Sequence, residues 1–192
     1  MRLTVPAAAD RAALADVVGR VVRLDPAAVV RLRDRGGRVE VWAGTPFEVL
    51  VSTEAPGSVT PGDVTVPGSD LLAALSVVDA PEVDPGPPVD DRWRGDLPGE
   101  GPWRPVGELP AAAVGVVVAR ANAEPSTLDD TVWEGGGVRV PARCLVAVAG
   151  MGWPEDGAAL TVALSGDEGW LRVEVGGVAI VRRRRPRLAV LV

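Results

Sequence analysis

The sequence of 192 residues contains no histidine, no tyrosine and no lysine, and all 20 of its basic residues are arginine. Without histidine, neither a Ser-His-Asp nor a Cys-His catalytic arrangement can form within this chain, and a zinc site of cysteine and histidine is excluded as well. Without lysine, a Schiff base with a carbonyl substrate is also excluded. The composition therefore removes most of the side chains that serve as general bases and covalent nucleophiles.

Cysteine is nearly absent, since Cys144 is the only one. One cysteine cannot form an intrachain disulfide, so nothing in the sequence indicates an oxidising compartment. The apolar neighbours of Cys144 favour a small buried hydrophobic residue over a thiol activated at a helix N-terminus. The N-terminal residues lack an apolar stretch of signal-peptide length, and no apolar run approaches the ~20 residues that span a bilayer. We therefore expect a cytoplasmic protein without a membrane partner.

The glycine motifs that bind phosphates are missing too. Residues 135–137 are three consecutive glycines between strand-like segments, which is typical of a turn and not of a P-loop or a dinucleotide site. Three carboxylate pairs remain for chemistry, and they are Asp90-Asp91, Asp129-Asp130 and Glu155-Asp156. Each pair adjoins proline or glycine in a predicted loop, where solvated acidic residues are usual; a hard-cation site or a glycosidase pair is the alternative. We expect no catalytic residue, metal or cofactor, and a carboxylate- or metal-dependent enzyme is the least favoured function.

Small and β-branched apolar residues are abundant instead. The apolar fraction is 47% but the aromatic fraction only 4%, so valine, alanine and leucine must form most of the core, and valine favours strands. In the first third of the chain, apolar periodicity predicts a strand, a helix and then three strands. These predicted elements are Arg2–Val5, Ala7–Val22, Val29–Arg33, Arg38–Trp42 and Phe47–Thr53.

The same β-α-β-β-β order recurs between Gly137 and Arg185. A strand from Val138 leads into an apolar helix that reaches Met151, and three strands follow at Ala159–Leu164, Trp170–Val175 and Val178–Arg182. Residues 38–41, Arg-Val-Glu-Val, reappear unchanged as residues 172–175, and the Val-Pro-Ala of residues 5–7 reappears at residues 140–142. Several matches in the same order predict an internal duplication.

The predicted fold class is α+β, with a mostly antiparallel sheet built from a duplicated β-α-β-β-β unit and helices packed on one face. Residues 1–79 hold the first repeat and a further strand–helix pair at Asp63–Pro67 and Ser69–Val78. Residues 80–109 form an excursion rich in proline and glycine. Residues 110–192 hold a helix at Pro110–Ala123, the second repeat and a final apolar segment at Leu188–Val192.

This pattern resembles the repeat of DNA sliding clamps, the processivity factors. Within residues 37–75 the segments Arg-Val-Glu-Val-Trp-Ala, Phe-Glu-Val-Leu-Val-Ser, Pro-Gly-Asp-Val-Thr-Val-Pro and Leu-Leu-Ala-Ala-Leu follow a strand-strand-strand-helix rhythm. The resemblance covers roughly two thirds of the chain and rests on this rhythm and the duplication, not on a diagnostic motif. It implies a clamp-like fold. Bacterial clamps carry three such domains and line their ring with basic helices, whereas here Arg11 and Arg20 are offset by Asp10 and Asp16.

Two tryptophans mark the first candidate site. Trp93 and Trp103 are the only aromatic residues of the stretch from residue 80 to 105. They either cover the domain or bind a partner, because tryptophan is enriched at interface hot spots.

Four consecutive arginines mark the second candidate site, as a contact for an anion or a nucleic acid. They are Arg182, Arg183, Arg184 and Arg185, with Arg143 and Arg187 as further members. In a strand, alternate members of the run point to opposite faces, so the four cannot form one surface. The alternative is a solvated strand end that protects a sheet edge from aggregation.

The sequence thus favours a non-enzymatic cytoplasmic scaffold or protein-interaction module with a clamp-like duplicated fold. Its expected partner is another protein or a second copy of the chain, bound through strand edges and the segment around Trp93 and Trp103. A clamp-like DNA-associated factor that uses the arginine patch is the alternative, because a chain of net charge −6 can hold nucleic acid only through a local basic face.

Overall fold

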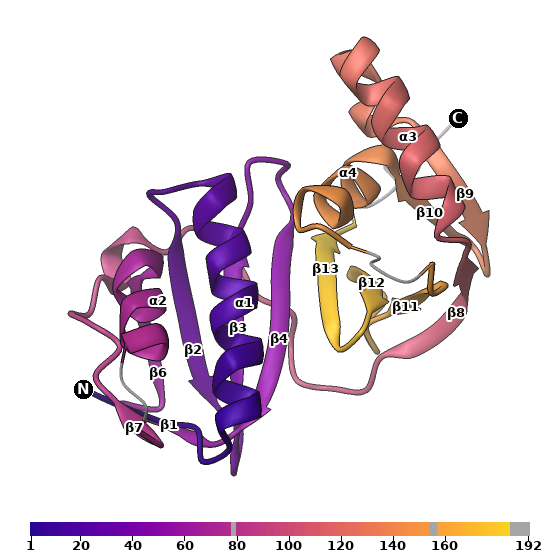
Figure 1. Cartoon of the computed structure of the whole chain (residues 1–192). Coiled ribbons are helices and arrows are strands. Elements are labelled where there is room, and N and C mark those ends of the chain that lie inside the picture. Colours follow the sequence, from indigo (N-terminus) through magenta and orange to yellow (C-terminus); the bar gives the residue numbers. More distant parts are fainter. Residues whose placement is uncertain (78–79, 154–156, 185–192) are drawn as a thin grey trace.

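The computed structural model describes residues 1–77, 80–153 and 157–184 (Figure 1). In this part of the chain there are four α-helices, α1 (Ala8–Leu24), α2 (Gly68–Val77), α3 (Ala112–Ala123) and α4 (Ala142–Gly150). Two short 3-10 helices, η1 (Asp90–Arg92) and η2 (Pro125–Asp129), lie in the connections. No helix of the described residues has both the length and the apolar character that crossing a membrane requires.

Thirteen strands are described, and most belong to one large sheet. The first half of the chain contributes β1 (Arg2–Thr4), β2 (Val29–Asp34), β3 (Arg38–Gly44), β4 (Leu50–Pro56), β5 (Ser58–Thr60), β6 (Asp63–Pro67) and β7 (Glu82–Val83). The second half contributes β8 (Arg104–Leu109), β9 (Thr131–Gly135), β10 (Val138–Pro141), β11 (Leu160–Leu164), β12 (Trp170–Val175) and β13 (Val178–Arg183).

The large sheet has eight antiparallel strands in the order β6-β2-β3-β4-β13-β12-β11-β8. The two halves of the chain meet at its centre, where β4 pairs with β13 and Val51 lies opposite Ile180. The strands follow the same order outward from this seam in both halves. In the first half the order is β4, β3, β2 and then β6, and in the second half it is β13, β12, β11 and then β8. Two small sheets, β5-β1-β7 and β10-β9, lie at the outer ends of the halves.

The helices all pack on one face of the large sheet, in two pairs (Figure 1). Helix α1 contacts α2 over the first half, and α4 contacts α3 over the second. In each half the helix of the β-α-β-β-β unit, α1 or α4, lies against the sheet, and the other helix packs beside it. The predicted duplication and the predicted fold class are therefore confirmed.

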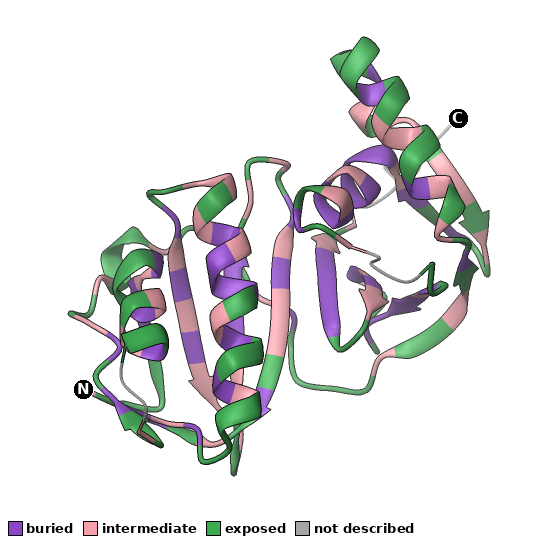
Figure 2. Ribbon diagram, viewed as in Figure 1, coloured by how far each residue is buried: buried purple, intermediate pink, exposed green. Residues whose placement is uncertain are grey.

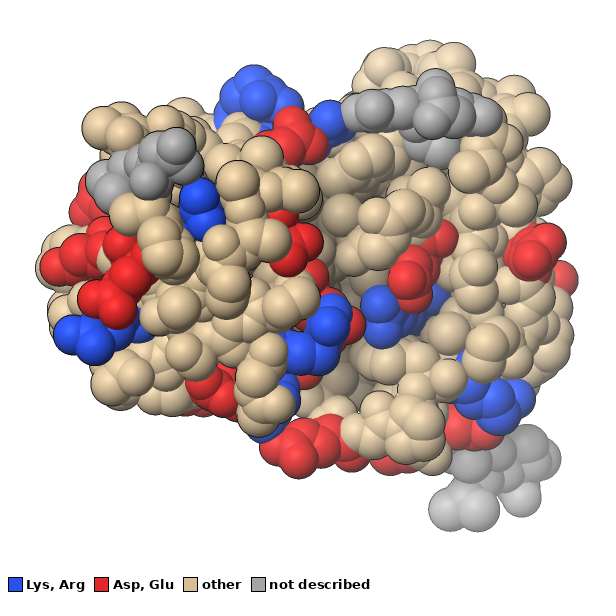
Figure 3. Space-filling view, turned by 60° about the horizontal axis from the view of Figure 1, so that its bottom comes forward, with Lys and Arg blue, Asp and Glu red and all other residues tan. Residues whose placement is uncertain are grey.

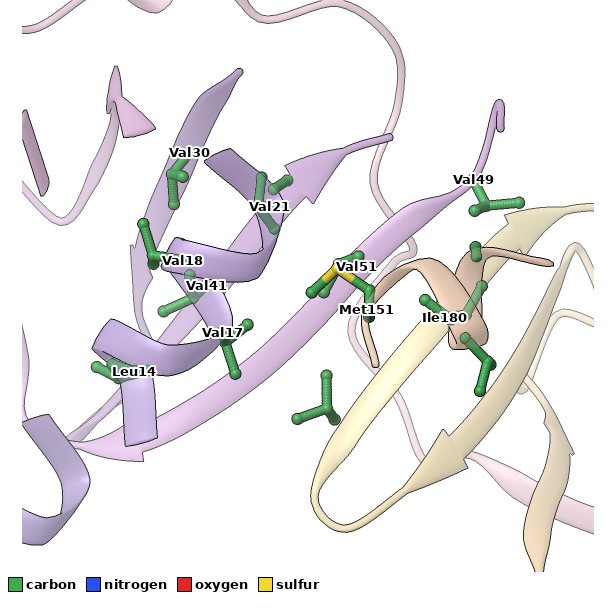
Figure 4. Close-up of a cluster of buried hydrophobic side chains, with 14 of the residues drawn as sticks. Leu14, Val17, Val18, Val21, Val30, Val41, Val49, Val51, Met151 and Ile180 are labelled. Carbon is green, nitrogen blue, oxygen red and sulfur yellow. The ribbon is translucent and has the colours of Figure 1, made fainter. Parts of the chain in front are cut away.

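Strand alternation places the main core between the sheet and the helices. In β3 and β13 the residues that face the helices, such as Val41 and Ile180, are buried with the inner sides of α1 and α4. Met151, at the C-terminal end of α4, is fully buried and lies at the seam beside Val51 and Ile180 (Figure 4). One continuous cluster therefore spans both halves, which makes them a single packed body.

The opposite face of the sheet carries a second, smaller cluster. Trp42, Trp170, Ala179 and Val181 are its buried members. Each of them is next in sequence to a residue of the main core, and successive side chains of a strand point to opposite faces, so these four point away from the helices. Four partly buried residues cover this cluster, and three of them, Trp93, Leu97 and Trp103, come from the connection between η1 and β8.

Two glycines, Gly107 and Gly135, leave room for the ring of Trp133. Its ring lies so close to Gly107 of β8 and Gly135 of β9 that a Cβ atom at either position would approach the ring to 2.7 Å or 2.5 Å. Both distances are shorter than real Cβ contacts. The ring therefore fits against the backbone of two strands only because neither residue has a side chain.

The structure corrects several predicted boundaries. The strand expected at Phe47–Thr53 begins only at Leu50, because residues 45–49 form a turn in which Glu48 has a positive φ of 57°. The excursion expected at residues 80–109 is shorter, since β8 forms from Arg104 as an edge strand of the large sheet. Pro105 lies at a register shift, a position where a missing N–H is tolerated. The short strands β5 and β7 were also not predicted, and Leu188–Val192 lies outside the described residues.

Candidate functional site: a tryptophan strap and an arginine pocket

Residues 84–103 form a strap across the sheet face that lies away from the helices. The strap leads from β7 to β8 and thereby connects the two halves. It begins at the edge of the sheet, where the main-chain N–H of Val89 donates to the Thr65 oxygen at 2.8 Å and the Asp90 carboxylate accepts from the Thr65 N–H at 2.6 Å. These bonds satisfy polar groups of the outer strand β6, so the strap also protects an edge.

Both tryptophans of the strap are half-buried on the outer cluster, one over each half of the sheet. The guanidinium of Arg31 in β2 lies 5.8 Å from the Trp93 ring, and that of Arg172 in β12 lies 5.5 Å from the Trp103 ring. Such distances allow cation–π attraction. The Trp93 indole N–H donates to the Gly95 oxygen at 3.0 Å, which fixes the orientation of the ring.

Ion pairs tie the strap to both halves as well. Glu100 pairs with Arg35, directly after β2, and Asp96 pairs with Arg183 of β13. Most of these side chains are well exposed, so each pair adds little to the free energy of folding. Their placement nevertheless fixes the course of a glycine- and proline-rich segment over the sheet.

Two hollows flank the strap. One, of about 370 Å³, lies between Trp93 and its neighbouring arginines on one side and residues 25–29 and 44–46 on the other. The second, of about 550 Å³, lies between residues 95–99 of the strap and the outer side chains of β2, β12 and β13. Trp93 therefore borders a surface depression and is not sealed beneath the strap.

The arginine run is divided between the two faces of β13. Arg182 and Arg184 follow Ile180 and lie on the helix side, whereas Arg183 follows Val181 and turns outward to Asp96. Arg182 and Arg184 line a third hollow, of about 350 Å³, together with residues of η2 and β10. Arg185 and Arg187 lie outside the described residues.

A buried arginine beside this hollow joins the two halves. Arg143 of α4 donates to both carboxylate oxygens of Asp129, at 3.1 Å and 2.7 Å, and also to Glu48 and the main-chain oxygen of Phe47 in the first half. Arg182 donates to Asp129 at 3.1 Å. Partial burial opposes ionisation of Asp129, but the hydrogen bonds from the two arginines prevail and its pKa lies below the usual range. Asp129 is thus a structural anion at neutral pH.

The remaining candidates for chemistry have structural surroundings. The Cys144 thiol is completely buried, and burial raises its pKa to about 12, so the thiol is protonated and inert at neutral pH. Asp90 caps the β6 edge and Asp130 pairs with Arg120. Glu155 and Asp156 are outside the described residues. Among the residues that the structure describes, no group of three acidic or cysteine side chains could hold a metal ion.

Helix α3 presents an apolar surface to solvent. Val116 is 72% exposed, and Ala112, Gly115 and Ala119 are exposed beside it (Figure 2). The helix carries no charge before Arg120. A shallow hollow of about 260 Å³ between α3, η2 and β9 continues this surface.

Basic residues do not collect on the helices. Arg11 of α1 is buried and donates to the main-chain oxygens of Val5 and Pro6, and Arg20 donates to Asp16 and to the Met151 oxygen. Helix α2 has no basic residue. On the face shown in Figure 3, acidic and basic side chains alternate and neither sign forms a continuous patch.

Comparison with solved structures identifies the architecture. The DNA polymerase sliding clamp from Bacillus subtilis superimposes with a TM-score of 0.59 at 10% identity, over 100% of this chain and 67% of that chain. The DNA polymerase III beta chain from Streptococcus pneumoniae gives 0.60 at 8% identity, and the griselimycin-bound sliding clamp from Bartonella birtlesii gives 0.57 at 15% identity. Each of these two matches covers 97% of this chain and 66% of the clamp.

The protein therefore has the fold of a DNA sliding clamp, at about two thirds of a clamp's length. Residues 1–95 match the model of a domain of unknown function, DUF8010. A search of the curated proteins gave no match.

The sequence predicts only part of the third hollow, the arginine pocket, which Arg182 and Arg184 line. Thr131 and Arg139 of the β9–β10 hairpin lie far from Leu171 in the sequence, and they line one hollow only because this hairpin, η2 and the β12–β13 pair converge there. The strap's acidic anchors, Asp96 and Glu100, were missed too, although acidic residues in a proline-rich segment opposite arginine-rich strands could have indicated such pairing.

Proposed function

We propose that the protein is a non-enzymatic cytoplasmic scaffold that binds another protein, or a second copy of itself, through the strap face. The observation that carries this proposal is the placement of Trp93 and Trp103, both half-buried on the face that lacks helices, with one hollow beside Trp93 and a second along residues 95–99 of the strap. In this arrangement the strap, residues 84–103, is the interaction segment between the two repeats.

The physical argument is one of preorganisation. A tryptophan that is already held by a cation–π contact and a main-chain hydrogen bond loses little conformational freedom when a partner covers it. Its remaining exposed ring surface then contributes hydrophobic binding energy, which is why tryptophans dominate many interfaces. The ion pairs of Asp96 and Glu100 hold the strap in the same place before and after binding.

The test compares a strap variant with a matched tryptophan variant elsewhere. Trp93→Ala/Trp103→Ala removes the proposed contacts, whereas Trp153→Ala removes a tryptophan that lies near Arg20 on the helix side. Self-association is measured by light scattering over a range of concentrations, and partners are captured from lysate of the native cell and identified by mass spectrometry. We expect the strap variant alone to lose self-association or one defined partner.

Two results together would reject the scaffold proposal. They are a monomer at every concentration and a set of captured proteins that is the same for the native chain and the strap variant. Circular dichroism on each variant establishes that a lost interaction does not arise from lost structure.

A DNA-associated role is the second candidate, because the structures that superimpose on this chain are those of DNA polymerase sliding clamps. The arginines of β13 are the local basic group that such a role would use. Fluorescence anisotropy of a labelled duplex and a single strand, at low and then at physiological salt, tests it. Steeply salt-dependent binding that Arg182→Gln/Arg184→Gln abolishes would support the DNA role, and no binding at low salt would exclude it.

A further inference from the structure

The hollow between η2, β10 and the β12–β13 pair has an unusual lining. It contains four arginines, Arg139, Arg182, Arg183 and Arg184, and a single carboxylate, that of Asp129. The other lining residues are Thr131, Gly137, Pro141 and Leu171. The Arg183 guanidinium turns to Asp96 on the opposite face of the sheet, so three guanidinium groups, those of Arg139, Arg182 and Arg184, surround the hollow. In a chain of net charge −6 they form a strong local reversal of sign.

The one carboxylate of the lining is already engaged. Asp129 accepts three hydrogen bonds, two from Arg143 and one from Arg182, so it has little capacity left to neutralise the other arginines. Arg184 donates to the main-chain oxygen of Glu168 at 2.8 Å, and this bond to a neutral atom leaves its charge in place.

The other two arginines have acidic partners that solvent screens. Arg139 pairs with Glu134 and Arg183 with Asp96, and all four side chains are more than half exposed. Exposed pairs of this kind contribute little to stability and exchange readily for a better acceptor. The guanidinium groups of Arg139 and Arg184 are thus available to an anion that enters the hollow, whereas that of Arg183 lies on the opposite face.

We propose that this hollow, the arginine pocket, is a binding site for a phosphate group carried by a small ligand. Guanidinium forks match the oxygen geometry of phosphate and bind it through paired hydrogen bonds. Phosphate brings up to two negative charges and three or more acceptor oxygens, which suits several converging donors better than the two oxygens of a carboxylate. The Thr131 hydroxyl offers a further donor, and Leu171 and Pro141 form an apolar wall for the part of the ligand that carries the phosphate.

The shape of the site favours a compact ligand over a nucleic acid. A volume of about 350 Å³ accommodates a phosphate and a group of the size of one ring. A nucleic acid needs a row of cations along its backbone, whereas Arg139 and Arg184 each contact an acidic residue, Glu134 and Glu168. The phosphate proposal does not depend on the scaffold role, because the strap tryptophans do not line the arginine pocket.

The experiment is isothermal titration calorimetry on the full chain at low ionic strength. The probes are inorganic phosphate, pyrophosphate and phenyl phosphate, with chloride as the competing anion. The test variant is Arg139→Gln/Arg184→Gln, which leaves the Asp129–Arg143–Arg182 contacts intact. The matched control is Arg38→Gln, which removes an exposed arginine paired with Glu54 on the first half.

We expect the phosphates to bind the native chain and the control alike, and the double variant to bind at least tenfold more weakly. Phenyl phosphate should bind more tightly than inorganic phosphate because of Leu171 and Pro141; equal affinity would identify free phosphate as the ligand chemistry. The proposal is overturned if no phosphate binds, if the control loses as much affinity as the double variant, or if chloride competes equally. Duplex DNA that binds and depends on the same two arginines, without binding of the small phosphates, would overturn it as well.

Discussion

Arg143 and Asp129 form a two-point ion pair within the second half of the molecule, and the same Arg143 guanidinium reaches across to the first half. The Arg143 side chain is buried, and its guanidinium also contacts the Phe47 oxygen and the Glu48 carboxylate in a turn of the other half. One side chain therefore connects α4, η2 and the β3–β4 turn. Because the contact is made across the seam, it affects how the halves fit and not only how each one folds.

Removal of this cation should be costly. We expect Arg143→Met to lower the free energy of unfolding by about 2 kcal/mol, less than the ~3–5 kcal/mol of a fully buried pair because Asp129 is half exposed. Urea denaturation measures the change. Arg139→Met, whose pair with Glu134 is exposed, is the matched control and should change the free energy by less than about 0.5 kcal/mol. Equal losses in both variants would contradict the structural role of Arg143.

Between pH 3 and pH 8, stability should depend on pH only at the acid end. Hydrogen bonding from Arg31 lowers the pKa of Asp63, and Asp129 is held below its usual range by Arg143 and Arg182 against the effect of burial. A carboxylate with a lowered folded-state pKa stabilises the fold above its unfolded pKa of about 3.9 and loses this contribution as the pH falls through the folded value.

The chain has no histidine, so we expect a flat stability between about pH 5 and 8 and a steady loss below about pH 4. Urea midpoints at pH 7, 5, 4 and 3 test this. Asp63→Asn should reduce the slope below pH 4, and a slope unchanged in this variant would assign the acid sensitivity to other groups.

The Cys144 thiol should react only when the protein unfolds. Its side chain is fully buried and burial raises its pKa to about 12, so almost no thiolate exists at neutral pH. We expect labelling by a thiol-specific disulfide reagent to be undetectable in the native state and complete in urea. Fast native labelling would show that α4 opens locally.

The close packing around the Trp133 ring predicts that alanine substitutions at two glycines, Gly107 and Gly115, change stability in opposite directions. Gly107→Ala would place a Cβ atom 2.7 Å from the Trp133 ring and should destabilise the fold by about 1–3 kcal/mol, as overpacking does. At Gly115 of α3 no atom lies within 4 Å of the added Cβ, so Gly115→Ala should stabilise by about 0.5–1 kcal/mol through helix propensity. Thermal denaturation measures the stability of both variants, and a shift of the melting temperature in the same direction in both would refute the close packing of Trp133 against Gly107.

The strap should detach when its anchors are removed. We expect Asp96→Asn/Glu100→Gln to make residues 84–103 more sensitive to limited proteolysis several-fold, while the free energy of unfolding changes by less than about 1 kcal/mol because both pairs are exposed. Cleavage sites are located by mass spectrometry. Unchanged proteolysis would assign the course of the strap to Trp93 and Trp103 alone.

The regular elements were predictable because their apolar periods are clear. The alternation of Arg38–Trp42 and the helical spacing in Ala7–Val22 led to the duplicated unit, the fold class and the clamp resemblance. Short strands without such a period, β5 and β7, were not predictable, since main-chain pairing with β1 defines them. The strand β8 was hidden by Pro105, which only an edge position tolerates.

The candidate site could be predicted only in part. Trp93 and Trp103 stand out in a polar segment, but their contacts with Arg31 and Arg172 depend on which strands the segment crosses. The arginine pocket needs three elements to converge, and no local pattern encodes that. Whether the tryptophans and the arginines bind partners stays a prediction.

The pairing of Val51 with Ile180 has a consequence for the expression of either half of the chain alone. Since β4 and β13 are both interior strands of one sheet, a fragment that ends before β8 would leave Leu50–Ser52 of β4 as an unpaired edge and uncover the apolar residues beneath Met151. Exposed edges of this kind recruit other strands, so each half expressed alone should aggregate or pair with a copy of itself. The two repeats, although similar in topology, therefore depend on each other to cover the edge and the apolar residues at the centre of the sheet.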